Sequence, residues 1–207
     1  MRYISHLDLM RTWERTLRRA RLKLAHTQGF NPRPRLVFAA PLSVGVTSDA
    51  ELVDVILEDE LGASDLRARL QPALPPGIEV YECAEMPLEA PPVMASVLSA
   101  DYAVELENAG DLQEAINGFL AAATIPYERS RKGAAKQADM RPAVLDLWLA
   151  QDGRLGMRLR LDVEGMAVRP EEVVRALAPE ARVRHVHRTA LQLKEAFTPP
   201  REGAHAA

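Results

Sequence analysis

Residues 101–120 read DYAVELENAGDLQEAINGFL, and the spacing of their apolar positions changes part-way along. In residues 101–107 apolar side chains such as Tyr102 and Val104 alternate with polar ones, which is typical of a half-buried β-strand. In residues 112–120 the apolar side chains recur at three- and four-residue spacing, which predicts an amphipathic helix. The stretch therefore predicts a strand followed at once by a helix.

The same kinds of pattern recur on both sides of this stretch. In the second half they predict an extended segment at 125–129, strands at 142–150 and 155–163 around the Asp152-Gly153 turn, a helix from Pro170 to Leu177 and a last strand at 183–193. In the first half they predict a helix at 7–24, strands at 36–40 and 51–58, a helix capped by Ser64 at 64–74 and a strand at 78–83. Residues 41–48 are expected to form a turn or a bulged connection.

Both halves then have the order strand, helix, strand, strand, helix, strand. The expected fold class is α+β, with two tandem ferredoxin-like (βαββαβ) units and antiparallel sheets. The expected domains are residues 1–86, a linker at 87–99, a second unit at 100–197 and a disordered tail at 198–207. Residues 2–4 alone are available for the first strand, so that strand is very short or the reading frame begins late.

Composition excludes several classes of protein. The chain has 207 residues, of which 47% are hydrophobic and 27% are charged, as expected of a soluble globular protein. It has no apolar run of about 18 residues and no apolar core of a signal peptide near its start, so a cytoplasmic location is expected. A single cysteine, Cys83, excludes an internal disulfide, a zinc site built from cysteines and an iron–sulfur cluster ligated by this chain.

Charge is strongly segregated along the chain. Residues 1–35 hold nine Lys/Arg and two Asp/Glu, whereas residues 36–126 hold two Lys/Arg and sixteen Asp/Glu. Residues 127–207 hold fifteen basic and eleven acidic residues, and the whole chain has a net charge of −3. The basic segment is therefore able to bind an anionic partner or to pair with the chain's own acidic segment.

Four arginines form the strongest signal in the basic segment. Ser5 and Asp8 have the spacing of a capping box at the start of the helix at 7–24. On that helix the arginines fall opposite the stripe that contains Trp13 and Leu17. Guanidinium groups bind phosphate in a bidentate manner, so this face predicts anion binding. The alternative is pairing with Glu51, Asp54 and Glu58. The four residues are Arg11, Arg15, Arg18 and Arg19.

Two further segments carry candidate binding residues. The Pro-stiffened loop at 27–35 presents Gln28, Asn31, Arg33 and Arg35 to a ligand or partner, although Asn31 is also able to bridge the turn. A basic arm contains Arg129, Arg131, Lys132 and Lys136, which predicts either phosphate contacts or a solvated loop.

Chemistry by a bound metal or cofactor is not expected. His185 and His187 lie two residues apart on one strand, but two imidazoles do not complete a zinc site. The sequence contains no dinucleotide-binding, P-loop, nucleophile-elbow or zinc-protease motif. His6 is a candidate general acid, base or phosphate ligand, or else a residue with local hydrogen bonds only.

The N-terminal motifs resemble a bacterial family, the radical SAM-linked domain of unknown function. Its members occur as the C-terminal part of cobalamin-binding radical SAM proteins or as separate polypeptides, so the resemblance implies a radical SAM protein, on a separate chain, as partner. It also makes structured RNA a plausible substrate, with no membrane and no DNA expected. The motifs are SHLDLM at 5–10, Arg15, Arg18-Arg19, QGFNPRP at 28–34, and Pro41-Leu42 with Gly45 and Ser48.

Three functions are compatible with these observations. The first is a non-catalytic accessory module that binds RNA or another anionic partner through the arginine helix and the loop. The second is an enzyme that resembles the metal-independent RAMP-type RNA endonucleases, with His6 as general base, although the glycine-rich loop of those proteins is not visible here. The third is a scaffold that binds protein only.

Overall fold

A computed structural model describes residues 2–131, 134–161 and 168–194. The protein has a mixed α+β fold in which antiparallel strand pairs predominate. Within the described residues, the chain forms two compact units. The first comprises residues 2–44, 52–96 and 193–194, and the second comprises residues 45–51, 97–131, 134–161 and 168–192.

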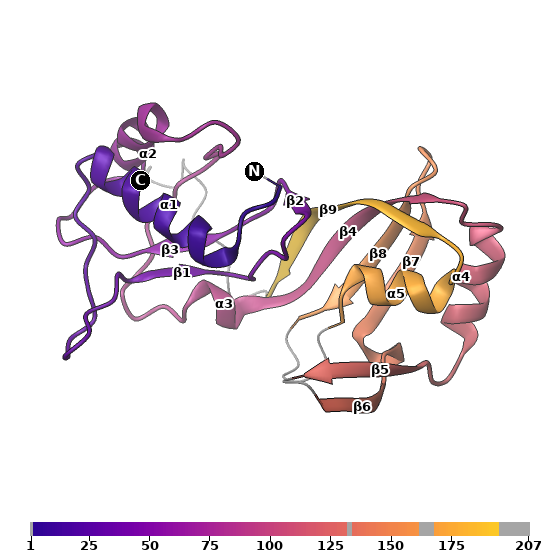
Figure 1. The fold of residues 1–207 in the computed structure, drawn as a ribbon. Helices are drawn as coiled ribbons and strands as arrows, with labels where there is room; N and C mark the ends of the chain where they lie inside the picture. The colour runs from indigo at the N-terminus through magenta and orange to yellow at the C-terminus, as the bar shows by residue number, and fades with distance from the viewer. Residues whose placement is uncertain (1, 132–133, 162–167, 195–207) are drawn as a thin grey trace, which may run out of the picture. The chain divides into compact units, whose positions relative to one another are not determined.

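The first unit packs helices on a small sheet (Figure 1). The antiparallel strands β1 and β3 pair Val37 with Asp54. The elements of this unit are α1 (His6–Arg19), β1 (Leu36–Phe38), β3 (Val53–Val55), α2 (Ala63–Leu70), the 3₁₀ turn η1 (Gln71–Ala73) and α3 (Val93–Ser96).

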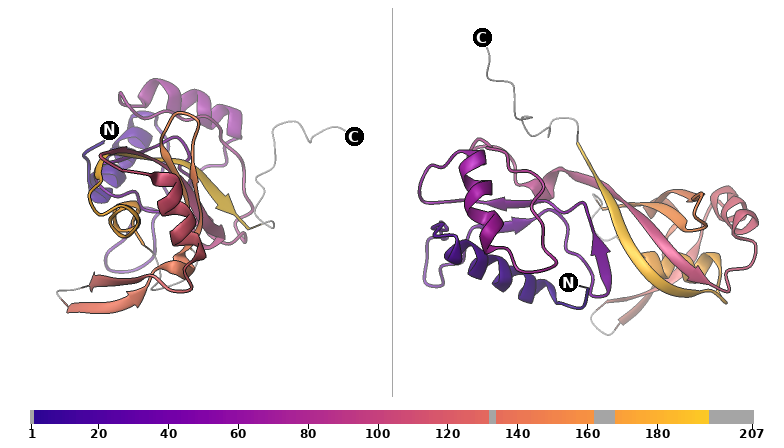
Figure 2. Two further views of the ribbon diagram at one scale, coloured as in Figure 1. Left: turned by 90° about the vertical axis from the view of Figure 1, so that its right-hand side faces the viewer. Right: turned by 90° about the horizontal axis from the view of Figure 1, so that it is seen from above.

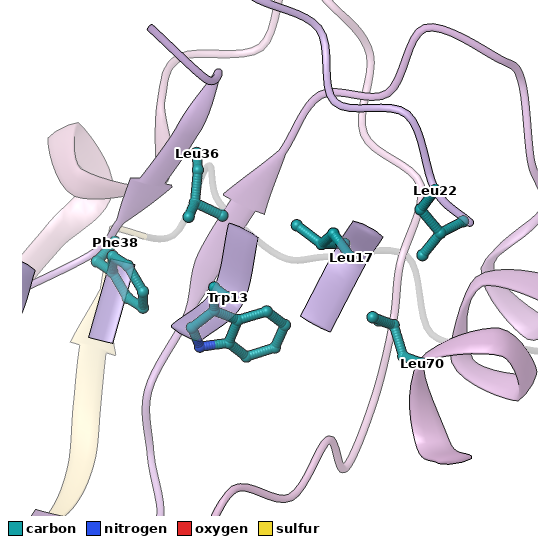
Figure 3. Close-up of a cluster of buried hydrophobic side chains, with 6 residues drawn as sticks. All are labelled: Trp13, Leu17, Leu22, Leu36, Phe38 and Leu70. Carbon is teal, nitrogen blue, oxygen red and sulfur yellow. The ribbon is translucent and has the colours of Figure 1, made fainter. Parts of the chain in front are cut away.

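The core of the first unit lies between α1 and β1. Trp13 and Leu17, four residues apart on α1, face Leu36 and Phe38 of β1 (Figure 3). Leu22 and Leu70, the latter from α2, complete the buried cluster. The apolar stripe predicted for this helix is therefore confirmed, and it fixes which face of α1 is turned away from the core.

The second unit is built on a five-stranded sheet in the order β2-β9-β4-β8-β7. The long strands β4 and β9 are neighbours in this sheet (Figure 2). Helix α4 contacts both β7 and α5, and β5 and β6 form a separate hairpin. The elements are β2 (Val46–Ser48), β4 (Val97–Glu107), α4 (Leu112–Ala121), β5 (Pro126–Arg131), β6 (Ala134–Asp139), the 3₁₀ turn η2 (Arg141–Ala143), β7 (Val144–Leu149), β8 (Leu155–Arg160), α5 (Pro170–Leu177) and β9 (Arg182–Leu193).

Strand β2 corrects the prediction of a turn or bulge at residues 41–48. Residues 46–48 pair in parallel with β9, and the buried Val46 lies opposite the buried Val186. Just after β2, the Glu51 carboxylate accepts hydrogen bonds of 2.9 and 3.1 Å from Nη1 of Arg188, whose side chain is only 4% exposed. A short segment from the first half of the chain is therefore an integral strand of the second unit's sheet.

The tandem ferredoxin-like arrangement is not confirmed. In the first half, residues 2–4 and 78–83 form no strand, and β1 and β3 make a two-stranded sheet. The helix predicted at 7–24 begins as expected but ends at Arg19, and the cap of α2 is Gly62 rather than Ser64. Residues 97–99, predicted to be linker, belong to β4. In the second half, α4 and α5 match their predicted positions closely.

The packing around Gly156 leaves no room for a side chain. It lies opposite Trp148 across the β7–β8 pair, and a Cβ at this position would overlap with the indole ring. Gly156→Ala should therefore lower the free energy of unfolding by about 1–3 kcal/mol because the ring must move. Gly118→Ala is the matched control: nothing lies near Gly118, which is inside α4, so alanine should raise stability by about 0.5–1 kcal/mol. Urea denaturation measures both changes, and equal effects of the two variants would contradict this role of Gly156.

Candidate functional site

Helix α1 begins with the capping interaction that the sequence predicts. The Oγ of Ser5 accepts a hydrogen bond from the backbone N–H of Asp8 at 3.2 Å, and its hydroxyl donates to Oδ2 of Asp8 at 2.7 Å. This second hydrogen bond is the main reason why the pKa of Asp8 lies below its ordinary value. The cap fixes the first turn and so sets the direction of every side chain that follows.

The face of α1 opposite the core carries exposed arginines. Arg11 makes one loose ion pair with Asp8, at 3.4 Å, and both side chains are exposed. The Nε of Arg15 donates to the backbone oxygen of Arg11 at 3.2 Å. Among the described residues, no carboxylate forms an ion pair with Arg15 or Arg18. Most of this positive charge is therefore not neutralised by the chain itself.

The acidic residues that the sequence offered as alternative partners are engaged elsewhere or unpaired. Glu51 binds Arg188, as described above. The Oδ2 of Asp54 accepts a hydrogen bond of 2.7 Å from the backbone N–H of Val93. Glu58 lies in the same groove as Arg18 without forming an ion pair with it. Pairing of the arginine face with these three carboxylates is thus not observed.

Arg19 differs from the other arginines of α1. Its Nη2 donates to the backbone oxygen of Ala73 at 2.7 Å and to Oγ1 of Thr16 at 3.3 Å. These bonds tie the end of α1 to η1, so this guanidinium is already used in holding the fold together.

The loop at 27–35 is a hairpin with a polar, exposed tip. His26 and Pro34 form a bridge at its base, and the backbone N–H of Thr27 donates to Arg33. Arg35 is held by backbone hydrogen bonds to Ala25 and Ile56. The predicted side chains all lie exposed on this hairpin, and so does Phe30, which sequence reasoning did not single out. The exposed residues are Gln28, Phe30, Asn31, Arg33 and Arg35.

The chain reverses sharply after α1, at a position where glycine is the usual residue. Arg21 has a φ of 58°, in the left-handed region. Its N–H donates to Arg18, and the N–H of Leu22 donates to Leu17, which together make a Schellman motif. The left-handed conformation costs about 1–2 kcal/mol for a residue with a Cβ. Arg21 therefore carries backbone strain that a glycine at this position would not.

Beside this turn lies an open groove of about 510 Å³. Its cationic residues are Arg18, which the sequence predicted, and Arg21 and Lys23, which it did not, and His26 also lines it. Because the sequence predicts a helix that continues to residue 24, it does not predict the turn beside which the groove lies. The lining residues are Glu14, Arg18, Arg21, Leu22, Lys23, Leu24, His26, Pro34 and Glu58.

His6 is not brought into the arginine face. It is half-buried, and its ring meets Phe38, a core residue, edge-on at 5.4 Å between centroids. Its Nδ1 is buried and meets no hydrogen-bond partner among the described residues. The structure therefore places this imidazole on the core side of α1.

The predicted basic arm forms the β5–β6 hairpin. Arg129 and Lys136 are partners in its register, and Arg131 pairs with Ala134. Lys132 lies outside the described residues. The alternative of a solvated loop is therefore wrong for the residues that the structure describes, because they form a strand pair.

A polar cluster in the second unit involves the two histidines of β9. Oγ1 of Thr47 lies 2.8 Å from Nε2 of His185 and 2.7 Å from Nδ1 of His187. Nε2 of His187 lies 3.1 Å from Oδ2 of Asp49. These contacts join β9 to β2. Among the residues that the structure describes, no three His, Cys, Asp or Glu side chains are arranged to hold a metal ion.

Comparison with known families gives one result. Residues 1–175 match the family described as "Uncharacterized protein conserved in bacteria (DUF2344)". The chain belongs to this family. The description names no activity, and the match includes all of the arginine face, the hairpin loop and the groove. No curated protein matches the chain. In the described part of the chain, no helix has both the length and the apolar character needed to cross a bilayer.

The hydrogen bond from the Ser5 hydroxyl to the Asp8 carboxylate makes the pKa of Asp8 a test of the start of α1. Ser5→Ala removes the hydroxyl that donates to the Asp8 carboxylate, so the pKa of Asp8 should rise toward its ordinary value of 3.8. Since the folded pKa is depressed, the stabilisation that it reports is present above the unfolded pKa and is lost as the pH falls through the folded value. Carboxyl NMR titration measures the shift. Arg11→Gln is the control and should raise the pKa less, because Arg11 is a smaller cause; an unchanged pKa in Ser5→Ala would contradict the capping geometry.

Proposed function

We propose that this protein is a non-catalytic RNA-binding module that acts with a radical SAM enzyme on a separate chain. The observation that carries the proposal is the exposed arginine face of α1, defined by Arg11, Arg15 and Arg18. Its guanidinium groups meet no carboxylate in the described residues apart from the loose pair of Arg11 with Asp8. Like charges on one helix face repel one another, and an anionic partner removes that repulsion.

The spacing of these arginines favours a polyanion over a single small anion. Residues four apart on a helix rise about 6 Å along its axis, so Arg11 and Arg15 present charges at regular intervals. A nucleic acid backbone offers phosphates in series and releases counterions when cations neutralise them. Separate phosphates on one strand are thus a natural match for separate guanidinium groups.

The hairpin loop adds a second kind of contact. Phe30 is fully exposed at its tip, next to Asn31. An exposed aromatic ring stacks on the unpaired bases of RNA loops, and amide side chains bond to base edges. The loop and the arginine face belong to the same unit, so both are available to one RNA molecule.

The proposed division of labour with a radical SAM enzyme rests on the N-terminal motifs and on the chain's single cysteine. An iron–sulfur cluster that cleaves SAM needs several thiolates, and Cys83 alone cannot supply them. Radical chemistry would therefore occur on the partner, and this chain would present the substrate. We also infer that the strand order β9-β4-β8-β7 represents one ferredoxin-like unit, extended at its edge by β2.

Salt-dependent RNA binding tests this proposal. Wild-type protein should bind total tRNA with an affinity that falls steeply between 50 and 200 mM salt. The double variant Arg11→Gln/Arg15→Gln should bind more weakly, and its slope of log K against log salt should be smaller by about 1–2, because each lost phosphate contact removes about 0.7–0.9. Fluorescence anisotropy across a salt series measures both quantities.

The matched control is Arg67→Gln/Arg175→Gln, which removes two exposed arginines outside this face. It should keep the wild-type slope. Equal losses in both double variants would show that net charge alone governs binding and would overturn the proposed interface. Capture of a radical SAM protein without RNA would support a protein-only scaffold instead, and RNA cleavage that His6→Ala abolishes would support an endonuclease.

A further inference from the structure

The left-handed conformation of Arg21 has a physical reason to persist. Its neighbour Leu22 is buried in the same cluster as Leu17, and the N–H of Leu22 donates to the Leu17 oxygen at 2.9 Å. The turn is thus fixed by core packing on one side and by the helix end on the other. Glycine would adopt this conformation without strain, so the arginine side chain has to be considered for a role of its own.

The side chain of Arg21 has no internal structural role. It is exposed, and no hydrogen bond or ion pair joins its guanidinium to any described residue. Arg18 is also exposed, and its guanidinium forms no hydrogen bond or ion pair with a described residue. Both line the 510 Å³ groove, whereas the third cation there, Lys23, forms an exposed ion pair with Asp59 at 3.7 Å. Two unpaired guanidiniums in one groove are suited to a phosphate.

The other lining residues restrict the chemical class of ligand that the groove is able to bind. Glu14 and Glu58 are carboxylates, which accept hydrogen bonds from hydroxyl and amino groups and repel a second anionic group. Leu24 and Pro34 supply apolar surface. The groove volume lies within the range of small-molecule sites, about 300–1,000 Å³. The lining therefore suits a molecule with one phosphate, several hydrogen-bond donors and an apolar ring.

We propose that this groove binds a nucleoside monophosphate group, with its phosphate on Arg18 and Arg21 and its hydroxyl or amino groups on Glu14 and Glu58. The inference deepens the proposed function and rests on it, because the natural source of the group is a nucleotide of the bound RNA. A free nucleotide offers the same chemistry, and the experiment separates the two sources.

Arg21→Gly gives a test with two opposite outcomes. Glycine adopts the left-handed conformation without strain, so the melting temperature of the full chain should rise by about 2–4 °C. Binding of 5′-AMP and 5′-GMP, followed by NMR chemical-shift changes, should weaken at least tenfold. If the Arg21 side chain takes no part in binding, the more stable variant should keep the wild-type affinity for both nucleotides.

Asn108→Gly is the matched control for the backbone. Asn108, with a φ of 55°, is the other non-glycine residue at positive φ among the described residues, and it belongs to the second unit. Its replacement should leave nucleotide binding unchanged. Glu14→Gln should weaken the binding of both nucleotides but not of inorganic phosphate. Wild-type affinity for nucleotide in Arg21→Gly would overturn the inference.

The sources of the nucleotide are separated by competition. If the group belongs to RNA, tRNA should displace 5′-AMP from wild-type protein but not from Arg11→Gln/Arg15→Gln at the same concentration. If free nucleotide is the ligand, tRNA should leave it bound. RNA binding with its full salt slope but no nucleotide binding would overturn this inference and leave the proposed function intact. Nucleotide binding without RNA binding would support the groove and overturn the proposed interface.

Discussion

The arrangement of the first unit depends on the burial of one apolar stripe of α1. Trp13 and Leu17 are covered by β1 and α2, so the opposite side of the helix has to face outward. The same burial extends past the helix end, since Leu22 joins the cluster and holds the turn that follows. The burial of this one stripe therefore accounts for three features of the first unit. They are the exposed arginine face, the left-handed Arg21 and the groove beside it.

The charge segregation of the sequence leaves α1 exposed in the structure because two of its three candidate partners bind other groups and the third, Glu58, forms no ion pair with it. A basic first segment and an acidic second one are able to cancel, and nothing in the sequence excludes that. In the structure, Glu51 is committed to Arg188 within the second unit, and Asp54 caps the start of the short helix α3. Two of the carboxylates that were candidates for pairing with α1 thus bind a buried arginine or a backbone N–H instead.

Several elements are predicted correctly by local signals in the sequence, although the Ser64 cap and the strand pattern at 78–83 are not confirmed. The Ser5 cap, Pro170 at the start of α5 and the alternation in β4 all predict their elements, because each depends on neighbouring residues. Strand β2 was missed because it has three residues and a partner about 140 positions away. The end of α1 was missed because an arginine occupies the position that glycine usually marks. The groove residues after α1 were not predicted for the same reason, because the helix was predicted to continue through them.

The fixed backbone of the first unit favours the proposed RNA binding. The helix is capped, the turn after it is held at Leu17, and the hairpin base is closed by a hydrogen bond of 2.8 Å from Arg35 to Ala25. Arg19 adds a tether from the helix end to Ala73. The arginines therefore lie on backbone that is already ordered, so the proposed binding would have to restrict side-chain rotamers only. A basic segment without these constraints would lose more entropy for the same phosphate contacts. The same reasoning applies to the strain at Arg21. The fixed backbone there holds one guanidinium at the groove with only a modest loss of stability.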